Sequence, residues 1–551
     1  RNLPDWTADA DLLDVYVELH AKVDSAVPAI FYPQIVGGAA GPTYSSVESF
    51  ADDATMNVTY RPSVGAPNFT QNTLQTLNIV NSAGTAPLSV LGGEVVVTYR
   101  YSTGDAAQTE TVRFYVDQDA ATPGTATNTF ATIAPVISQS GRVVQHIWYR
   151  VHSSPSQAAT FTIGGQVGTS TKKYNSYTLT ATNIRAGDTP TIIYDMSADA
   201  GNYWNNTTNI AGESRSTLTN GPVAVELFVT FTWDGDAASA VTKSVTYSGA
   251  QQGTNSTANT WFNRPVFVEL PETVTKTYRS SYLFTHYSHS NGTSIAVGTV
   301  TIGVNASTTV ITKLGDIEAY TSRYVLKIAS STLSGGDTIQ WTTRALEINE
   351  TRNQNNVAYF ANEVVITYDA ALGENDPAAP LMKQLRTVEY VLGASTDATA
   401  RVSAATTWAG STWGTTKAGG GTRSVVLAGS NIRVVNAFLE TSYYTTASGN
   451  TTLENVYLDT GSGTDVPVGE VVGVSIFSTT GLTGHVRGTH DVTALFAMKS
   501  DSQWAAGVPV VGGFNATMSA GNRSLTSMKL YITYESDYSL VAHTEVKTVR
   551  F

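Results

Sequence analysis

The eight histidines of the chain are the first candidates for metal binding or proton transfer. His485, His490 and Asp491 lie within one short stretch and are the best candidate metal ligands. His286 and His289 are three residues apart, and an odd spacing places two side chains on opposite faces of a strand. His286 and His289 therefore do not form a metal pair on a strand.

Two further histidines, His20 and His152, end two strands of the same residue pattern. A position that recurs in this way is typical of packing or hydrogen bonding. We expect the histidines to be structural and predict no metal site at them.

Calcium is the other cofactor to consider, because it binds clustered oxygen ligands. The clustered carboxylates are Asp9, Asp11 and Asp14; Asp117 and Asp119; and Asp234 and Asp236. None of these groups has the spacing of a complete calcium loop, and aspartate is common in turns because its side chain satisfies turn amides. We predict no cofactor, with calcium as the alternative.

The sequence contains no recognisable catalytic motif. It has no Gly-x-Ser-x-Gly elbow, no phosphate-binding glycine loop with lysine and no His-Glu-x-x-His. It also has no cysteine, which excludes disulfides, thiolate metal sites and cysteine nucleophiles. We predict that the protein is not an enzyme.

Two kinds of residue indicate glycans. Trp408 and Trp413 lie in a glycine-rich and threonine-rich insert and are candidates for stacking against a sugar. Asn-x-Ser/Thr acceptor sites for glycosylation occur at Asn57, Asn68, Asn205, Asn206, Asn255, Asn291, Asn305, Asn349, Asn450, Asn515 and Asn522.

The composition indicates an all-β protein. Hydrophobic residues make up 41% of the chain and charged residues 14%, which is the reverse of the balance that keeps a chain disordered. Threonine, valine and tyrosine favour strands, and the 46 glycines favour turns. The formal net charge of -12 argues against nucleic acid as a partner.

No apolar run reaches the ~18 residues that a membrane-spanning helix needs. The sequence opens at Arg1, and the stretch from there to Trp6 reads like the start of a processed, exported protein. We therefore expect an extracellular or cell-surface location without a membrane span.

A strand signature recurs four times and is the most informative feature of the chain. The copies are Val96-Val97-Thr98-Tyr99, Phe228-Val229-Thr230-Phe231, Val365-Ile366-Thr367-Tyr368 and Tyr531-Ile532-Thr533-Tyr534. A second strand follows each copy: Thr111-Val112-Arg113-Phe114, Ser244-Val245-Thr246-Tyr247, Thr387-Val388-Glu389-Tyr390 and Thr548-Val549-Arg550-Phe551. Because only a short polar segment separates the two, we predict that each pair forms an antiparallel hairpin.

Each repeat also opens with a strand rich in aromatic residues. These strands contain Tyr16, Trp148, Phe284 and Phe438. The repeats predict four tandem antiparallel β-sandwich domains of jelly-roll or immunoglobulin-like type, at residues 1–124, 125–256, 257–397 and 398–551, the last with longer insertions. Stacked end to end, they would form a rod. Little helix is expected; Asp491 to Phe496 is one plausible helical turn, with Asp491 as its N-cap.

The repetition and the lack of catalytic motifs favour a structural role. The leading hypothesis is a subunit of an extracellular polymer: a filament, pilus-like fibre, sheath or surface layer. One alternative is an adhesin or carbohydrate-binding array, which Trp408 and Trp413 would favour. Another is a viral capsid or fibre subunit, since jelly rolls also build capsids.

Self-association is expected at the first repeat. Repeats two to four have a β-patterned segment before the opening aromatic strand, whereas only residues 1–11 precede that strand in the first repeat. An unpaired sheet edge recruits another strand. We therefore predict that a strand from another copy adds beside residues 12–20 or their sheet partner.

Overall fold

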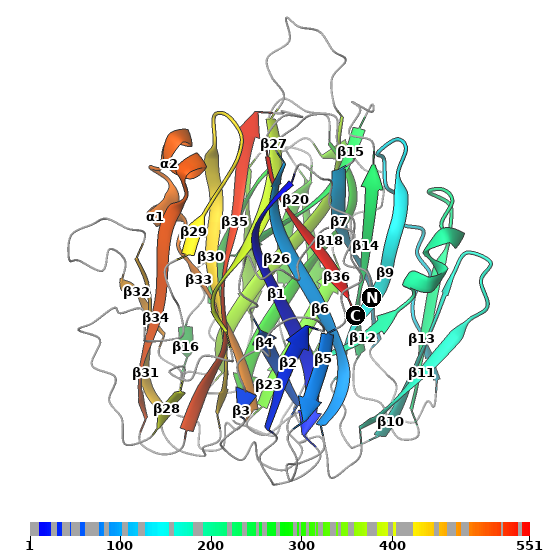
Figure 1. Ribbon diagram of the computed structural model, residues 1–551, viewed down its shortest axis with the longest axis horizontal. Coiled ribbons are helices and arrows are strands. Elements are labelled where there is room, and N and C mark those ends of the chain that lie inside the picture. Colours follow the sequence, from blue (N-terminus) through cyan, green and yellow to red (C-terminus); the bar gives the residue numbers. More distant parts are fainter. Residues whose placement is uncertain are drawn as a thin grey trace, which may run out of the picture.

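The computed structural model shows a protein built from antiparallel sheets, with 71% of the described residues in strands. It describes the strands and helices named below, together with residues 130–142, 168–172, 196–209, 270–271, 426–432 and 492–507. The prediction of an all-β protein is confirmed (Figure 1).

Four sheets, called core sheets 1 to 4, share one order of strands. Core sheet 1 has the order β36 (His543–Arg550), β6 (Leu88–Tyr101), β1 (Ala10–Val23) and β4 (Thr55–Tyr60). Core sheet 2 has the order β7 (Gln108–Asp119), β14 (Val223–Trp233), β9 (Val143–Ser153) and β12 (Thr191–Asp195).

Core sheets 3 and 4 repeat this order with short additions. Core sheet 3 contains β15 (Ala240–Ser248), β26 (Val357–Ala371), β18 (Lys276–His289) and β23 (Arg323–Ser330), with β16 (Gly253–Asn255) beside β26 and β24 (Thr338–Ile339) beside β18. Core sheet 4 contains β27 (Lys383–Ala394), β35 (Asn522–Asp537), β30 (Arg433–Thr445) and β33 (Gly484–Asp491), with β28 (Arg401–Ser403) beside β35.

In core sheets 2 to 4 the first strand in the sheet order is also the first in sequence, and it does not pair with the strand that precedes it in the chain. β7 follows β6 in the sequence but pairs with β14, with Thr111 opposite Thr230. In the same way β15 pairs with β26 and β27 pairs with β35. The predicted hairpins are therefore wrong, because the two strands of each pair belong to two neighbouring sheets.

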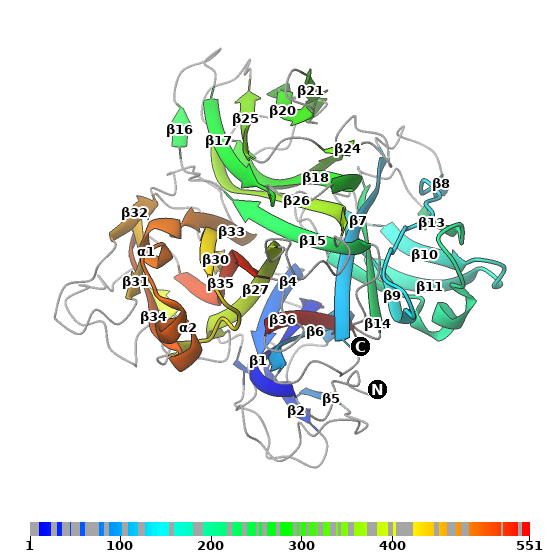
Figure 2. The same ribbon diagram turned by 90° about the horizontal axis from the view of Figure 1, so that it is seen from above.

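The last strand closes the arrangement. β36 follows β35 but pairs with β6 of core sheet 1, with Val546 opposite Thr98. The four core sheets surround a common centre, as Figure 2 shows from above. They do not form the end-to-end row that we predicted from the sequence, because β36 links the fourth sheet back to the first.

The prediction of an open edge in the first repeat is half right. Residues 1–124 supply three strands of core sheet 1, and the edge beside β6 takes a strand from outside that range. The strand is β36 of the same chain. Addition of a strand from a second copy stays a prediction.

The core sheets begin earlier in the chain than the predicted domain boundaries. β7 lies within residues 1–124 but belongs to the sheet of 125–256, and β15 and β27 cross the next two boundaries in the same way. Core sheets 2, 3 and 4 are each formed by one continuous stretch, 108–233, 240–371 and 383–537, and the number of independent sandwiches stays a prediction.

Further sheets complete the structure. They contain β3 (Tyr44–Ser45), β2 (Ile30–Ile35) and β5 (Leu77–Asn81); β11 (Lys173–Leu179), β10 (Ala159–Val167), β13 (Ile210–Ser216) and β8 (Thr127–Thr129); and β17 (Phe262–Glu269), β25 (Thr343–Glu350), β20 (Thr299–Val304) and β21 (Thr308–Lys313). The remaining strands are β19 (Ile295–Ala296) with β22 (Asp316–Ile317), and β29 (Arg423–Val425), β34 (Val508–Met518), β31 (Thr451–Asp459) and β32 (Glu470–Val474).

Alternation along the strands of core sheet 2 separates an apolar face from a polar one. On β14, Leu227, Val229 and Phe231 belong to a large buried hydrophobic cluster. Residues between them are equally buried but bind polar partners: Glu226 accepts from Tyr282 of core sheet 3, and Thr230 pairs with Thr111 of β7. Since successive side chains point to opposite faces, one sequence supplies both a hydrophobic core and a polar interface.

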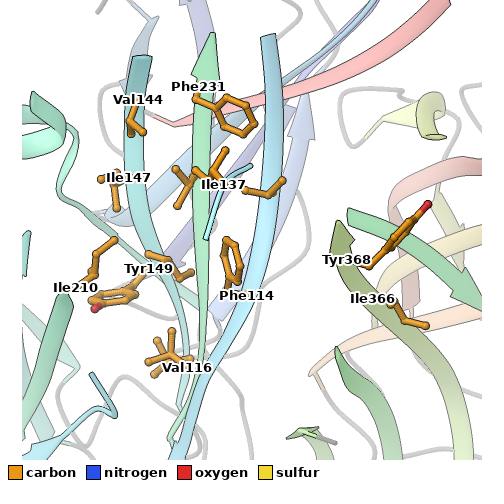
Figure 3. Packing of buried hydrophobic residues seen from close by; sticks show 14 of the residues in the cluster. Phe114, Val116, Ile137, Val144, Ile147, Tyr149, Ile210, Phe231, Ile366 and Tyr368 are labelled. Atoms are coloured by element: carbon orange, nitrogen blue, oxygen red, sulfur yellow. The ribbon is translucent and has the colours of Figure 1, made fainter. Parts of the chain in front are cut away.

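The apolar face of core sheet 2 packs against the sheet of β10 and β13. Figure 3 shows this cluster, in which Tyr149 of β9 points toward Ile210 of β13. Phe130 meets the Tyr149 ring edge-on, with the ring centroids 5.7 Å apart. Gly212 of β13 lies against both rings and leaves room for them, because a Cβ at this position would lie 2.6 Å from each.

Three short helical segments are present in the described part of the chain. They are the 3-10 helix η1 (Ser197–Asn202) and the α-helices α1 (Thr493–Phe496) and α2 (Asp501–Ala506). The helical turn at 491–496 is confirmed as α1, with its N-cap at Val492 and the Asp491 carboxylate accepting from the amide of Thr493 at 2.9 Å. The sequence reasoning missed α2, although Ser500 and Gln503 form a capping box that the sequence displays.

The contact at Gly212 predicts a large effect from a small change. Gly212→Ala should lower the free energy of unfolding by about 1–3 kcal/mol, because the added methyl group overpacks Phe130 and Tyr149. Chemical denaturation of the variant measures this. Gly201→Ala is the matched control, since a Cβ there meets no atom within 4 Å. Equal stability of the two variants would contradict the packing described.

Candidate functional site

The polar faces of the four core sheets meet at the centre of the molecule, and this region is the candidate functional site. Its regular feature is a pair of hydroxyl groups. One belongs to the first strand of a core sheet, and the other to the threonine of the recurring strand signature, which is called the signature threonine. The hydroxyl oxygens are 2.8 Å apart between Thr111 and Thr230, 2.7 Å between Ser244 and Thr367, and 2.8 Å between Thr387 and Thr533.

Two of these hydroxyl pairs also bind the backbone of the neighbouring core sheet. Thr367 donates to the carbonyl of Arg113 at 2.5 Å, and the amide of Arg113 donates to the Ser244 hydroxyl at 2.8 Å. The next junction repeats this pattern: Thr533 donates to the carbonyl of Thr246 at 2.7 Å, and the amide of Thr246 donates to Thr387 at 3.0 Å. The pairs therefore satisfy edge backbone groups that would otherwise be buried without partners.

The place where β36 pairs with β6 of core sheet 1 is called the closing junction, and it differs from the other three. Thr98 donates to the carbonyl of Glu389 at 2.6 Å, as the pattern requires. The residue opposite Thr98 on β36 is Val546, which has no hydroxyl to pair with Thr98 or to accept from the Glu389 amide. Thr548, which the sequence motif aligns with Thr111, stands two residues away, opposite Val96. The closing junction therefore lacks the hydroxyl pair.

Charged side chains cross the junction between core sheets 1 and 2. Glu94 of β6 accepts from the Trp148 indole at 2.9 Å and from Arg150 at 2.6 Å, both on β9. Burial alone would raise the pKa of Glu94, but Arg150 and the nearby His20 outweigh it and hold that pKa well below its ordinary value. Glu94 is therefore ionised in the folded protein.

Glu226 is the most connected buried charge. Its side chain is 0% exposed and accepts from Arg113 at 2.8 Å, from His152 at 2.9 Å and from Tyr282 of core sheet 3 at 2.5 Å. Burial would raise the pKa of Glu226, but Arg113 and Arg150 lower it well below its ordinary value. One carboxylate thus joins core sheets 2 and 3.

The imidazole of His152 is held between two partners. Burial lowers the pKa of His152, so the ring is neutral. Because Glu226 accepts, Nε2 carries the proton, and Nδ1 accepts from the hydroxyl of Thr191 at 3.3 Å. His20, at the same repeat position, is buried with its Nε2 3.8 Å from Glu94. The prediction that these two histidines are structural fits this arrangement.

Core sheets 4 and 1 are joined by a lysine and a tyrosine. Lys529 of β35 forms an ion pair with Glu18 of β1, and the charge of Lys529 lowers the pKa of Glu18 against the effect of burial. Tyr16 donates to Glu389 of β27 at 2.5 Å. Burial raises the pKa of Glu389.

Core sheets 3 and 4 meet through neutral groups. Ser248 of β15 donates its amide to the Asn436 side chain at 3.1 Å, and Asn436 donates back to the Ser248 carbonyl at 2.8 Å. The Ser248 hydroxyl donates to Thr489 at 3.0 Å. These hydrogen bonds join core sheets 3 and 4, as the ion pairs join the other sheets.

The centre is a closed network of buried ion pairs and hydrogen bonds between the core sheets. Glu94, Glu226 and Lys529 are at most 4% exposed, and each is bound to side chains from another core sheet. A buried ion pair needs complementary partners on all sides, and here they come from different sheets. The arrangement therefore fixes the relative positions of the sheets.

The acids of this centre were missed by the sequence reasoning, although the sequence contains the signal. Glu94, Glu226 and Glu363 each stand four residues before a signature threonine, and Lys529 takes that position in the fourth copy. An even spacing places each on the same strand face as its threonine. A charge repeated on the face that carries the repeated hydroxyl is a sign of a polar interface.

The candidate metal ligands of the last repeat do not form a cluster. His490 is buried and its pKa is lowered to about 3 by burial, whereas Asp491 is exposed and bound to Thr493. His485 lies on the same strand five residues away, which is an odd spacing. Among the described residues no group of three metal-binding side chains occurs.

The calcium candidates fall into two groups. Asp14 is buried and accepts from the amide of Val391 at 2.8 Å, while Asp11, Asp117 and Asp119 lie on strands. Asp9, Asp234 and Asp236 lie outside the described residues.

The two described acceptor sites outside strands have different environments. Asn205 is exposed, and its Oδ1 accepts from the amide and the hydroxyl of Thr207 at 2.8 and 2.6 Å. The Oδ1 of the partly buried Asn206 accepts from the amide of Ile137 at 3.1 Å and from Arg142 at 3.0 Å. Asn205 is therefore the more accessible of the two.

The remaining sugar-related residues are less fully described. Five acceptor sites lie within strands: Asn57, Asn255, Asn349, Asn515 and Asn522. Asn68, Asn291, Asn305 and Asn450 lie outside the described residues, as do Trp408 and Trp413. Glycosylation and sugar stacking stay predictions.

Comparisons with known proteins give no family. No family model and no curated protein matches the chain. Among solved structures, PNGase F from Flavobacterium meningosepticum is 13% identical, with 48% of this chain and 96% of that chain covered and a TM-score of 0.17. A putative secreted protein from Parabacteroides distasonis is 10% identical (48% and 89% covered, TM-score 0.14).

A third structure, of infectious bursal disease virus, is 9% identical, with 67% of this chain and 72% of that chain covered and a TM-score of 0.14. Scores this low support no statement about function. Among the described residues, no helix has the length and apolar character needed to cross a membrane.

The charges around Glu226 predict a dependence of stability on pH. Because the pKa of Glu226 is lower in the folded than in the unfolded protein, its contribution is present above about pH 4.5 and is lost as the pH falls further. Glu226→Gln should cost about 3–5 kcal/mol near neutral pH, since it leaves buried Arg113 and Arg150 undercompensated. The variant should then lose less stability than the wild type on acidification.

Denaturation curves across the acidic range measure this, with Asp199→Asn as the control. Asp199 pairs with Lys173, whose side chain is 56% exposed, so removing that charge should change stability by about 0.5 kcal/mol or less. An acid dependence in Glu226→Gln that equals that of the wild type would contradict the role of Glu226.

The missing hydroxyl at the closing junction predicts a stabilising change. Val546→Thr places a hydroxyl opposite Thr98 and next to the Glu389 amide, and should raise the free energy of unfolding by about 1 kcal/mol. Val549→Thr is the control, because Val549 stands opposite Val95, where no hydroxyl pair is expected. A gain for Val549→Thr but not for Val546→Thr would show that the hydroxyl pattern does not govern this junction.

Proposed function

We propose that this protein is a structural subunit of an extracellular polymer such as a filament, sheath or surface layer. The observation that carries the proposal is the closure of the structure by the last strand, β36, which pairs with β6 of core sheet 1. The four core sheets are also joined by buried hydrogen bonds and ion pairs between side chains of neighbouring sheets. Such a body keeps its shape when neighbours pull on it.

The absence of cysteine supports the same role. Exported domains are commonly stabilised by disulfides, which this sequence cannot form. The pairing of the last strand with core sheet 1 ties segments that are distant in sequence, as a covalent bridge would. The pairing of β36 with β6 joins Thr548 to Val96, 452 residues away.

The polar centre is better suited to stabilising the folded protein than to catalysing a reaction. Reactions at a protein site need groups that a substrate can reach, whereas Glu226 is 0% exposed and engaged by Arg113, His152 and Tyr282. Networks of this kind are costly to bury and are sensitive to geometry, so they fix one arrangement of the sheets. A repeating assembly needs subunits of one fixed shape.

Electron microscopy of the protein isolated from its native source tests the proposal. Ordered fibres or sheets with a repeat that accommodates one chain would support it. Closed shells would support the capsid alternative instead. Isolated particles at every concentration, including at the native cell surface, would contradict the polymer function.

A further inference from the structure

The closing strand β36 differs from the first strands of the other core sheets in the residue that it places opposite the signature threonine. At the other three junctions a hydroxyl of the first strand meets a signature threonine at 2.7–2.8 Å. At the closing junction the register position of that hydroxyl is taken by Val546. Valine has no hydroxyl, so the pair that β7, β15 and β27 each form cannot form at this position.

The span of chain that each pairing closes also differs. The hydroxyl pairs of the other three junctions join residues 119, 123 and 146 positions apart. The pairing of β36 with β6 joins residues more than 440 apart. Because the entropic cost of closing a loop grows with its length, closure by β36 is the costliest of the four.

β36 also contains a hydroxyl suited to a second register. Its Thr548-Val549-Arg550 matches Thr111-Val112-Arg113 of β7. Within this chain Thr548 stands opposite Val96, two residues from the place that Thr111 holds in core sheet 2. A shift of two residues keeps the same face of β36 toward the neighbouring sheet and brings Thr548 opposite Thr98.

We propose that β36 is exchanged between copies of this chain, adding to β6 of a second copy with Thr548 opposite Thr98. The occupant of the β6 edge is then the same strand from another molecule, so the exchange reuses a pairing that the closed form already makes. This inference rests on the proposed polymer function, for which it supplies the joining contact.

The geometry of the exchange leads to a chain of subunits. Each copy has one donor, β36, and one acceptor, the edge of β6. A contact between two different surfaces is heterologous, and it propagates into a fibre unless the rotation closes a ring. In the exchanged register Thr548 would supply the hydroxyl for Thr98 and for the Glu389 amide that Val546 does not supply. The exchanged form thereby gains the contact that the closed form lacks.

The natural lack of cysteine makes a clean test possible. Chains with Thr98→Cys alone and chains with Thr548→Cys alone are mixed at high concentration under assembly conditions and oxidised. Directly opposed residues on paired strands are close enough for a disulfide. Covalent dimers linked through positions 98 and 548, identified by mass spectrometry of the joined peptides, are expected.

Two controls make the result decisive. Val96→Cys with Thr548→Cys in one chain should form an intrachain disulfide, which shows that β36 is folded onto β6. Adding Val546→Thr to the chains that carry Thr548→Cys should lower the yield of dimers several-fold, because these chains keep Thr98 and the added hydroxyl strengthens closure within them.

Absence of any interchain disulfide while the single-chain control oxidises would overturn the proposal. Interchain bonds through positions 96 and 548 in place of 98 and 548 would overturn its register. Ordered polymers without interchain disulfides would reject strand exchange and leave the polymer function standing. Disulfide-linked copies that never form ordered polymers would reject the function and leave the exchange.

Discussion

Core sheet 1 depends on an edge strand from the far end of the chain. β7, β15 and β27 each begin a new sheet instead of pairing with the strand that precedes them, and β36 completes the first sheet. The constraint has a structural consequence: the fourth sheet is linked back to the first. It also has an energetic one, because an unsupplied edge would expose unpaired backbone groups.

The polar faces follow from this constraint. The four core sheets surround one centre, so the face of each sheet that points away from its hydrophobic core is buried as well. Burying backbone edges requires partners, and the pairs Ser244–Thr367 and Thr387–Thr533 provide them for Arg113 and Thr246. Burying charge requires the same completeness, which Glu226 achieves with partners from two core sheets.

The sequence was sufficient to predict strands but not their partners. Alternation and the fourfold signature predicted β6, β14, β26 and β35, and the short segment before β1 indicated an open edge. The hairpin prediction was wrong because residues 98 to 111 are as compatible with a turn between paired strands as with a crossing to the next sheet. That choice depends on contacts between strands that are distant in sequence, such as the hydroxyl pair of Thr111 and Thr230, whose partners lie more than 100 residues apart. The buried acids could have been anticipated from Glu94, Glu226 and Glu363, since their spacing to the signature threonine is constant.

The most direct test of the strand pairing is to trap β7 beside β14 with a disulfide. In a chain with Thr111→Cys and Thr230→Cys, the two positions are directly opposed, and oxidation of the native protein should link them nearly completely. In a chain with Thr98→Cys and Thr111→Cys, the two positions belong to different sheets and should stay unlinked. Efficient disulfide formation between positions 98 and 111, together with none between positions 111 and 230, would show that β6 and β7 form a hairpin. That result would contradict the strand pairing described.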